Sequence, residues 1–322
     1  MGFIANHRLA GRLSSAVFAL ICFCFCAYAQ TSSPTPPATP ASPPSNDIYI
    51  VDIKRHHDYK TRTDTLRFGE PKKITDFVGY NNQPFFMPDG QTILYTSQRN
   101  KQTDIYAYDI RTGQNRQITN TPESEYSPTL MSDRKNISVV RVESDGKTQR
   151  LWKFPLAGGA PSLVVEDVKG VGYHLWIDDH TLALFIVGSG KPNYLELYDT
   201  RTGKSEFITE NPGRVLRRIP NRNEFSFVHK ISNDQWDLKA FDLRTHTSAS
   251  LIDTLKGSED YAWLPGGELL MGKDSKLFMV TPLSGQKWSQ ADDFAVAGLQ
   301  GISRIAVSPK GDWLAMVVRH QD

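Results

Sequence analysis

Four arginines stand close together in the middle of the chain, on a predicted strand and the turn that follows it. They are Arg214, Arg217, Arg218 and Arg222. Guanidinium groups stay charged and bind carboxylates in a forked geometry. An inner strand that placed them at the mouth of a central channel would suit an acidic partner or ligand. The alternative is a solvated edge where these arginines pair with Glu210 and Glu224, and both interpretations stay open.

Histidine is the residue type best suited to a metal site, and the sequence has eight. His56-His57-Asp58 falls in a polar stretch, Lys54 to Thr65, that we interpret as a solvated loop. Neighbouring histidines in an extended segment point apart and rarely bind one metal. His174 is the histidine that we place on an inner strand, and it joins the four arginines as a candidate residue for binding a ligand or partner. We predict no metal and no cofactor.

The sequence lacks the motifs of several common enzyme classes. Gly188-Ser189-Gly190-Lys191 resembles part of a phosphate-binding loop, but the earlier glycine of that pattern is missing from the stretch that begins at Leu184, and Pro192 follows the lysine. No Gly-x-Ser-x-Gly nucleophile elbow occurs. The acidic residues form no close pair at matching inner-strand positions, as glycoside hydrolysis would need. We therefore predict that the protein is not an enzyme.

The overall charge excludes a general nucleic-acid binder. Lys and Arg number 37 against 35 Asp and Glu, a net charge of +2 over 322 residues. A nucleic-acid-binding protein would show a clustered basic excess. We expect a protein or cell-wall partner instead, and a monomeric chain.

The N-terminus has the pattern of a secretory signal peptide. A basic start is followed by an apolar run, Ala16 to Cys26, and by the small-x-small cleavage site Ala27-Tyr28-Ala29. We predict a signal peptide at 1–29 and a periplasmic or secreted protein. The run is short of the roughly 20 apolar residues of a membrane span, and a retained anchor is the alternative. Cys22, Cys24 and Cys26 all fall in this segment, so the mature chain has no disulfide.

A proline-rich linker at 30–46 (QTSSPTPPATPASPPSN) precedes the part that we expect to fold, 47–322. In that part a strand pattern recurs, best seen in Asp104-Ile105-Tyr106-Ala107-Tyr108-Asp109. Copies start at positions 47, 104, 150, 194, 237 and 276, at spacings of 57, 46, 44, 43 and 39 residues. A period near 40–45 residues with several strands per unit is typical of propeller blades.

Each repeat holds four predicted strands, which gives blades at 78–124, 125–169, 170–213, 214–257 and 258–298. A sixth repeat starts at Gly298 and contains only two strands. The two missing strands are at the other end, at 47–52 and 71–75, and closing a ring with both termini removes the open sheet edges. The sequence therefore predicts an all-β, six-bladed propeller. The aromatic residues at matching strand positions are expected to pack between blades: Tyr106, Trp152, Tyr198, Phe241 and Phe278.

Three segments resemble the WD40-like β-propeller repeat of the TolB type, whose motif combines a Pro-Asp-Gly turn, an Asp-Ile-Tyr strand and a strand that ends in Leu-Thr. They are Phe86-Met87-Pro88-Asp89-Gly90, the Asp104–Asp109 strand and Gln117-Ile118-Thr119. The resemblance covers most of 78–322. It implies a periplasmic module that binds other proteins through a face of the ring. TolB carries a further N-terminal α/β domain, where this chain has only the proline-rich linker.

Two functions remain open on the sequence alone. The favoured one is an exported, non-catalytic propeller that serves as a platform for a protein or ligand in the periplasm or cell envelope. The alternative is a module that binds or cleaves polysaccharide or peptide in the central funnel. Propeller lyases for pectin fragments hold a metal with several inner-strand histidines, and His174 alone does not meet that pattern.

Overall fold

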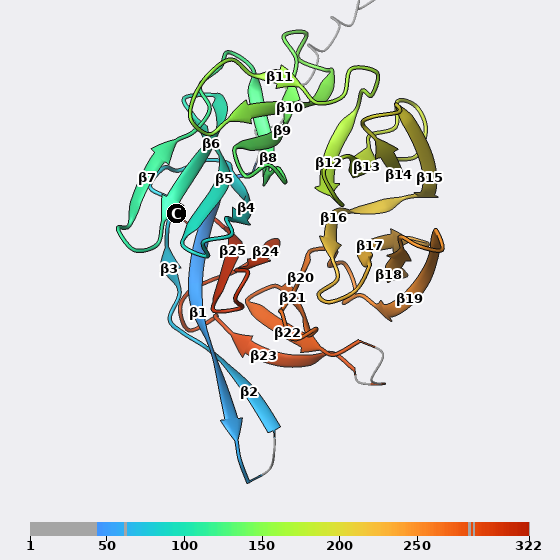
Figure 1. The fold of residues 1–322 in the computed structure, drawn as a ribbon. Coiled ribbons are helices and arrows are strands. Elements are labelled where there is room, and N and C mark those ends of the chain that lie inside the picture. The colour runs from blue at the N-terminus through green and yellow to red at the C-terminus, as the bar shows by residue number, and fades with distance from the viewer. Residues whose placement is uncertain (1–43, 61–62, 283–284, 286, 322) are drawn as a thin grey trace, which may run out of the picture. The chain divides into compact units, whose positions relative to one another are not determined.

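The computed structural model describes residues 44–321, apart from 61–62, 283–284 and 286. The chain divides into two units after Ala41. The predicted signal peptide and the linker up to residue 43 lie outside the described residues. Those residues form six antiparallel sheets around a central channel (Figure 1). No helix occurs among them, and so none there is long and apolar enough to cross a bilayer.

Five blades are built from consecutive strands, and within each blade the strands follow one another from the channel outward. The first blade holds β4 (Asn81–Phe86), β5 (Thr92–Arg99), β6 (Gln102–Asp109) and β7 (Gln114–Gln117). The second holds β8 (Ser124–Leu130), β9 (Asn136–Val142), β10 (Gln149–Pro155) and β11 (Ser162–Leu163). The third holds β12 (Val171–Trp176), β13 (Thr181–Ile186), β14 (Tyr194–Asp199) and β15 (Lys204–Glu210).

The fourth blade holds β16 (Pro212–Arg218), β17 (Glu224–Lys230), β18 (Trp236–Asp242) and β19 (Thr247–Asp253). The fifth holds β20 (Tyr261–Trp263), β21 (Leu269–Lys273), β22 (Lys276–Val280) and β23 (Ser289–Asp293). The sixth joins β24 (Arg304–Val307) and β25 (Trp313–Arg319) to β1 (Asn46–Asp58), with β3 (Lys72–Lys73) and β2 (Thr63–Phe68) on the outer side of β1. The predicted six-bladed propeller is confirmed.

The ring closes where the two ends of the described chain meet. β1 pairs with β25 over seven residues, from Asn46 opposite Arg319 to Asp52 opposite Trp313. Asp47, 3% exposed, accepts hydrogen bonds from His320 at 2.6 Å and from Thr75 at 2.9 Å, and pairs with Lys73 at 2.9 Å. Burial alone would raise the pKa of Asp47, but these three partners outweigh it and lower the pKa. A buried carboxylate therefore ties both termini to one blade.

The recurring Asp-x-Arg-Thr-Gly sequence forms the turn between the third and fourth strands of a blade. Asp109 Oδ1 accepts the backbone N–H groups of Arg111 and Thr112, at 2.9 and 3.0 Å. Gly113 follows with φ +72°, a conformation that glycine adopts without steric cost. Asp199 and Asp242 repeat the same side-chain-to-backbone bonds in the third and fourth blades. The repeat in the sequence is thus a repeated turn.

The core lies between neighbouring sheets, whose faces pack against each other. Of the five aromatic residues predicted to fill these spaces, Tyr106, Tyr198 and Phe241 are buried in three separate clusters. Trp152 and Phe278 are only half-buried. Packing between blades is therefore the role of most of this series.

The polar stretch predicted as a loop is instead a β-hairpin, which we call the arm (residues 53–60 and 63–68). Beyond Asp52, β1 leaves β25 and pairs with β2, from Ile53 opposite Phe68 to Asp58 opposite Thr63. Figure 1 shows β1 and β2 running out beyond the ring of sheets. At its base Gly69 leaves room for Asp52, because a Cβ there would lie 1.7 Å from Asp52 Oδ1.

Candidate functional site at the channel mouth

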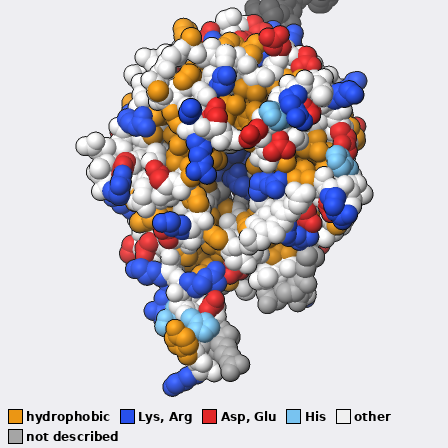
Figure 2. All heavy atoms as spheres, viewed as in Figure 1, with side chains coloured by type: hydrophobic (Ala, Val, Ile, Leu, Met, Phe, Trp, Pro, Cys, Tyr) orange, Lys and Arg blue, Asp and Glu red, His pale blue; other side chains and the backbone are white. Residues whose placement is uncertain are grey.

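The predicted arginine strand lines the channel, as the sequence indicated. β16 is the innermost strand of the fourth blade and carries Arg214, Arg217 and Arg218. Arg222 lies in the turn between β16 and β17. Figure 2 shows Lys and Arg side chains gathered around the central opening. The four arginines nevertheless have different surroundings, and these separate one of them from the rest.

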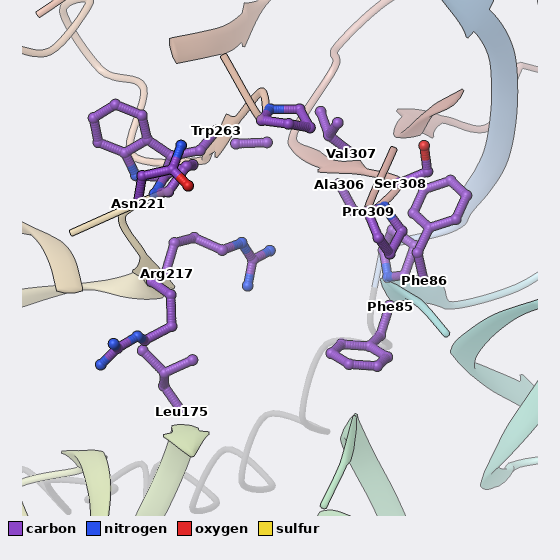
Figure 3. A pocket seen from close by; sticks show the side chains of 15 residues that line it. Phe85, Phe86, Leu175, Arg217, Asn221, Trp263, Ala306, Val307, Ser308 and Pro309 are labelled. Carbon is purple, nitrogen blue, oxygen red and sulfur yellow. The ribbon is translucent and has the colours of Figure 1, made fainter. Parts of the chain in front are cut away.

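A cavity of about 430 Å³, which we call the mouth cavity, lies where the inner strands end (Figure 3). Its apolar lining comes from four blades and includes Phe85, Phe86, Leu175, Trp263, Val307 and Pro309. Arg217, Arg218 and Asn221 supply most of the polar groups. Its described lining holds no aspartate, glutamate, histidine or cysteine. The cavity is therefore apolar with a cationic wall.

Arg217 is the cation that faces this cavity without a partner of opposite charge. Figure 3 shows its guanidinium group pointing into the cavity from the side opposite Phe85 and Phe86. Its one hydrogen bond in the described structure goes from Nη1 to the Leu216 carbonyl, at 3.3 Å. Burial lowers the pKa of Arg217, because its half-buried guanidinium is removed from part of the solvent. A carboxylate entering the cavity would therefore meet a desolvated, unpaired cation.

Arg218 is a second cation of the cavity wall without an ion pair in the described structure, whereas Arg222 is paired. Arg218 lines the cavity, and its Nη1 is buried without a hydrogen-bond partner. Arg222 is 40% exposed and pairs with Glu224 at 2.8 Å, so the predicted contact to Glu224 is confirmed. Exposed pairs of this kind contribute little to stability or binding.

Arg214 is paired, but with other residues than the sequence suggested. Its guanidinium lies 2.6 Å from Asp260 and 3.7 Å from Glu259, and it donates to the Ser303 carbonyl at 2.8 Å. The suggested pair with Glu210 is wrong, because Glu210 ends β15 in the preceding blade. Arg214 therefore links the fourth, fifth and sixth blades and does not offer a free charge.

The channel narrows beneath the mouth cavity. Arg304 on β24 donates to the Tyr173 hydroxyl on β12 at 2.9 Å, and its guanidinium lies 5.0 Å from the centre of that ring. These strands belong to the sixth and third blades, on opposite sides of the ring. The remaining space at this depth is about 60 Å³. Side chains thus close off the mouth cavity from the other end of the channel.

His174 does not present its imidazole to the mouth cavity. It is 8% exposed, and its Nε2 lies 2.7 Å from Ser138 Oγ, which also accepts from Trp176 Nε1 at 2.9 Å. Tyr261 and Trp263 of the fifth blade make the same pair of contacts to Ser226 of the fourth blade, two blades further round. Burial lowers the pKa of His174 to about 3, so the ring is neutral at physiological pH. His174 therefore links the third blade to Ser138 of the second blade.

A buried carboxylate pair was missed in the sequence. Glu125 on β8 is 0% exposed and hydrogen-bonds with Asp104 on β6 and with Thr119 and Thr121. Burial, and to a smaller extent the nearby Asp104 carboxylate, raise the pKa of Glu125 to about 8. Burial also raises the pKa of Asp104. The pair therefore shares a proton at neutral pH, and it joins the first two blades away from the mouth cavity.

No group of three or more metal-ligating side chains occurs among the described residues. In the arm, His57 Nδ1 lies 2.6 Å from Asp64 Oδ1. Alternation along β1 puts His56 on the other face of the arm. The two adjacent histidines therefore point apart, as expected for an extended segment.

The fold is similar to that of solved propellers, while no family model matches the sequence. A putative TolB from Agrobacterium tumefaciens aligns with a TM-score of 0.65 and 15% identity, over 87% of this chain and 100% of that one. TolB from Acinetobacter baumannii aligns at 0.52 and 16%, over 86% of this chain and 64% of that one. This chain thus spans less than two thirds of that TolB.

A puromycin-hydrolyzing peptidase from Mycobacterium tuberculosis also aligns, with a TM-score of 0.50 and 12% identity, over 76% of this chain and 45% of that one. Similarity at these identities shows the fold alone. The described unit is a six-bladed β-propeller whose fold is similar to that of the two TolB structures. Proteins of quite different activity share that architecture, and the function must be argued from the site.

Proposed function

We propose that this chain is an exported, non-catalytic propeller of the periplasm or cell envelope that binds an acidic, partly apolar segment of a partner protein in the mouth cavity. The observation that supports it is the unpaired guanidinium of Arg217 in an apolar cavity of about 430 Å³. Removing that cation from water is unfavourable, and a bound carboxylate would offset the loss with a charge-assisted hydrogen bond. Phe85 and Leu175 would contact the apolar part of the same segment.

The lining of the cavity favours binding over catalysis. General acid–base chemistry needs a group that titrates near the working pH within hydrogen-bond reach of the substrate. The described lining offers two arginines and no such group. Ser308 lies at the rim, but its hydroxyl donates to Asp312 at 2.6 Å and accepts two backbone N–H groups. Ser308 is thus engaged within its own turn, where its oxygen already accepts two hydrogen bonds, and the described lining holds no histidine that would activate it.

Envelope extract passed over the immobilised protein tests the proposal, with Arg217→Gln and Arg222→Gln compared to the native chain. A charge-assisted hydrogen bond contributes about 1.5–3 kcal/mol, so Arg217→Gln should weaken capture of the partner about 10- to 100-fold. Arg222→Gln removes the same charge from the adjacent exposed turn and should leave capture unchanged. Equal capture by both variants would contradict the proposal. Turnover of a peptide or polysaccharide would favour the enzymatic alternative.

A further inference from the structure

The arm carries a concentration of positive charge that the proposed function does not use. Its described residues include four cations and two carboxylates: Lys54, Arg55, Lys60, Arg67, Asp58 and Asp64. The resulting net charge of +2 equals that of the whole 322-residue chain. His56 and His57 would add to it when protonated. The charge of the protein is therefore unevenly distributed, with its excess in one projecting element.

The register of the arm places its cations on two faces. Lys54 lies opposite Arg67, and His56 opposite Thr65, so these side chains share one face. On the other face, Arg55 binds Asp64 at 3.3 Å and Glu268 of the fifth blade at 2.7 Å. The contact to Glu268 fixes the orientation of the arm. The first face therefore directs Lys54 and Arg67 away from Asp64 and Glu268, although Asp52 at the base of the arm pairs with Lys54.

The cations of the first face are accessible. Lys54 reaches Asp52 at 3.0 Å but its side chain remains 81% exposed. Arg67 is exposed and has no ion pair in the described structure. At the end of β1, Tyr59 is 85% exposed and contacts His57 edge-to-face, with ring centres 4.7 Å apart. Figure 2 shows the arm with basic and histidine side chains beside an orange apolar group.

We propose that the arm binds an anionic phospholipid surface. A narrow ribbon with an exposed tyrosine at its end and accessible lysine and arginine along one face has the composition of segments that lie at a membrane interface, where the ring enters the headgroup region and the cations meet phosphates. A ribbon two strands wide offers little of the roughly 800 Å² per partner of a stable protein interface. Electrostatic adsorption needs no such area. A two-stranded hairpin is also marginally stable alone, and adsorption would stabilise it.

Vesicle co-sedimentation of the full chain tests this proposal. Phosphatidylcholine vesicles with and without about 30 mol % phosphatidylglycerol separate charge-dependent binding from any contribution of the apolar N-terminal run. Each cation near such a surface is worth about 1 kcal/mol, so K54Q/R67Q should bind anionic vesicles about 30-fold more weakly. Tyr59→Ser should weaken the same binding, and raised salt should abolish it.

The matched control is R116Q/K204Q, which removes two exposed cations from the outer strands of other blades. It should bind anionic vesicles like the native chain, and both double variants should keep the native thermal transition. Equal weakening by the two double variants would overturn the proposal, and so would equal binding to neutral and anionic vesicles. The proposal would also be overturned if the native chain bound no vesicles and K54Q/R67Q instead lost an acidic protein partner.

Discussion

Replacing Glu125 by glutamine should remove a pH dependence of folding stability that the native chain shows between about pH 5 and 8. Glu125 is 0% exposed and its pKa lies near 8 in the folded protein, against an ordinary value of 4.5. Between these values the folded chain holds a proton that the unfolded chain has released. The free energy of unfolding therefore falls as pH rises. The stabilising contribution of the protonated Glu125 is fully present below about pH 4.5 and is lost as pH rises through about 8.

The magnitude follows from the size of the shift. Each pH unit inside the window changes the free energy of unfolding by about 1.4 kcal/mol, so the step from about pH 5.5 to 7.5 should lower it by roughly 2–3 kcal/mol. Glutamine cannot titrate, yet its amide can donate to Asp104 while its oxygen accepts from Thr119. E125Q should therefore be more stable than the native chain at pH 7.5 and close to it at pH 5.5.

Urea unfolding followed by tryptophan fluorescence at several pH values measures this difference. Subtracting the E125Q curve from the native curve removes the contributions of distant titrating groups, because those are common to both. The difference reports the titration of Glu125 together with Asp104, which contacts it. Glu70→Gln, at an exposed position, is the matched control and should retain the native pH dependence. Parallel native and E125Q curves across this range would refute a shared proton in the carboxylate pair.

Other predictions concern the links between blades. Ser226→Ala leaves two donors on β20 without their acceptor and should lower the free energy of unfolding by about 2–4 kcal/mol, measured by urea titration. Gly213→Ala should cost about 1–3 kcal/mol in thermal or urea unfolding, since its Cβ would lie 2.8 Å from that of Val228. Asp47→Asn should reduce the stability of the protein at pH 6, because the carboxylate and its ion pairs are lost. The variant should also lack the loss of stability that the native chain shows as pH falls below about 3.8, through the lowered pKa of Asp47. An unchanged acid transition in that variant would show that the closure does not depend on its charge.

The sequence predicted the ring because the information for it is local. The pattern in Ile105 to Ile110 indicates a strand, although the structure buries both of its faces. Asp109 with Gly113 defines the turn that follows. Counting such units also predicted the shared sixth blade. The arm was missed because its charged and polar residues, Lys54 to Asp58, give no apolar period, although they pair as a regular ribbon.

The sequence located the candidate site but did not show which of its residues are free to bind a ligand. Four arginines near one strand are visible in the chain, yet Arg214 is neutralised by Asp260, which lies 46 residues away on another blade. Arg217 has no ion pair in the described structure, and Asp260 acts on it only from a longer distance. His174 likewise depends on Ser138, 36 residues earlier. These distinctions arise from contacts between blades, which the spacing within one repeat does not determine.

Site-specific photo-crosslinking in cells tests the mouth cavity most directly. A photoreactive residue at Asn221, within the mouth cavity, should form an adduct with one envelope protein, and adding Arg217→Gln should abolish that adduct. The same residue at Ser258, in a pocket at the opposite end of the channel, should form none. An adduct from position 258 alone, or one from position 221 that survives Arg217→Gln, would contradict binding through the Arg217 cation.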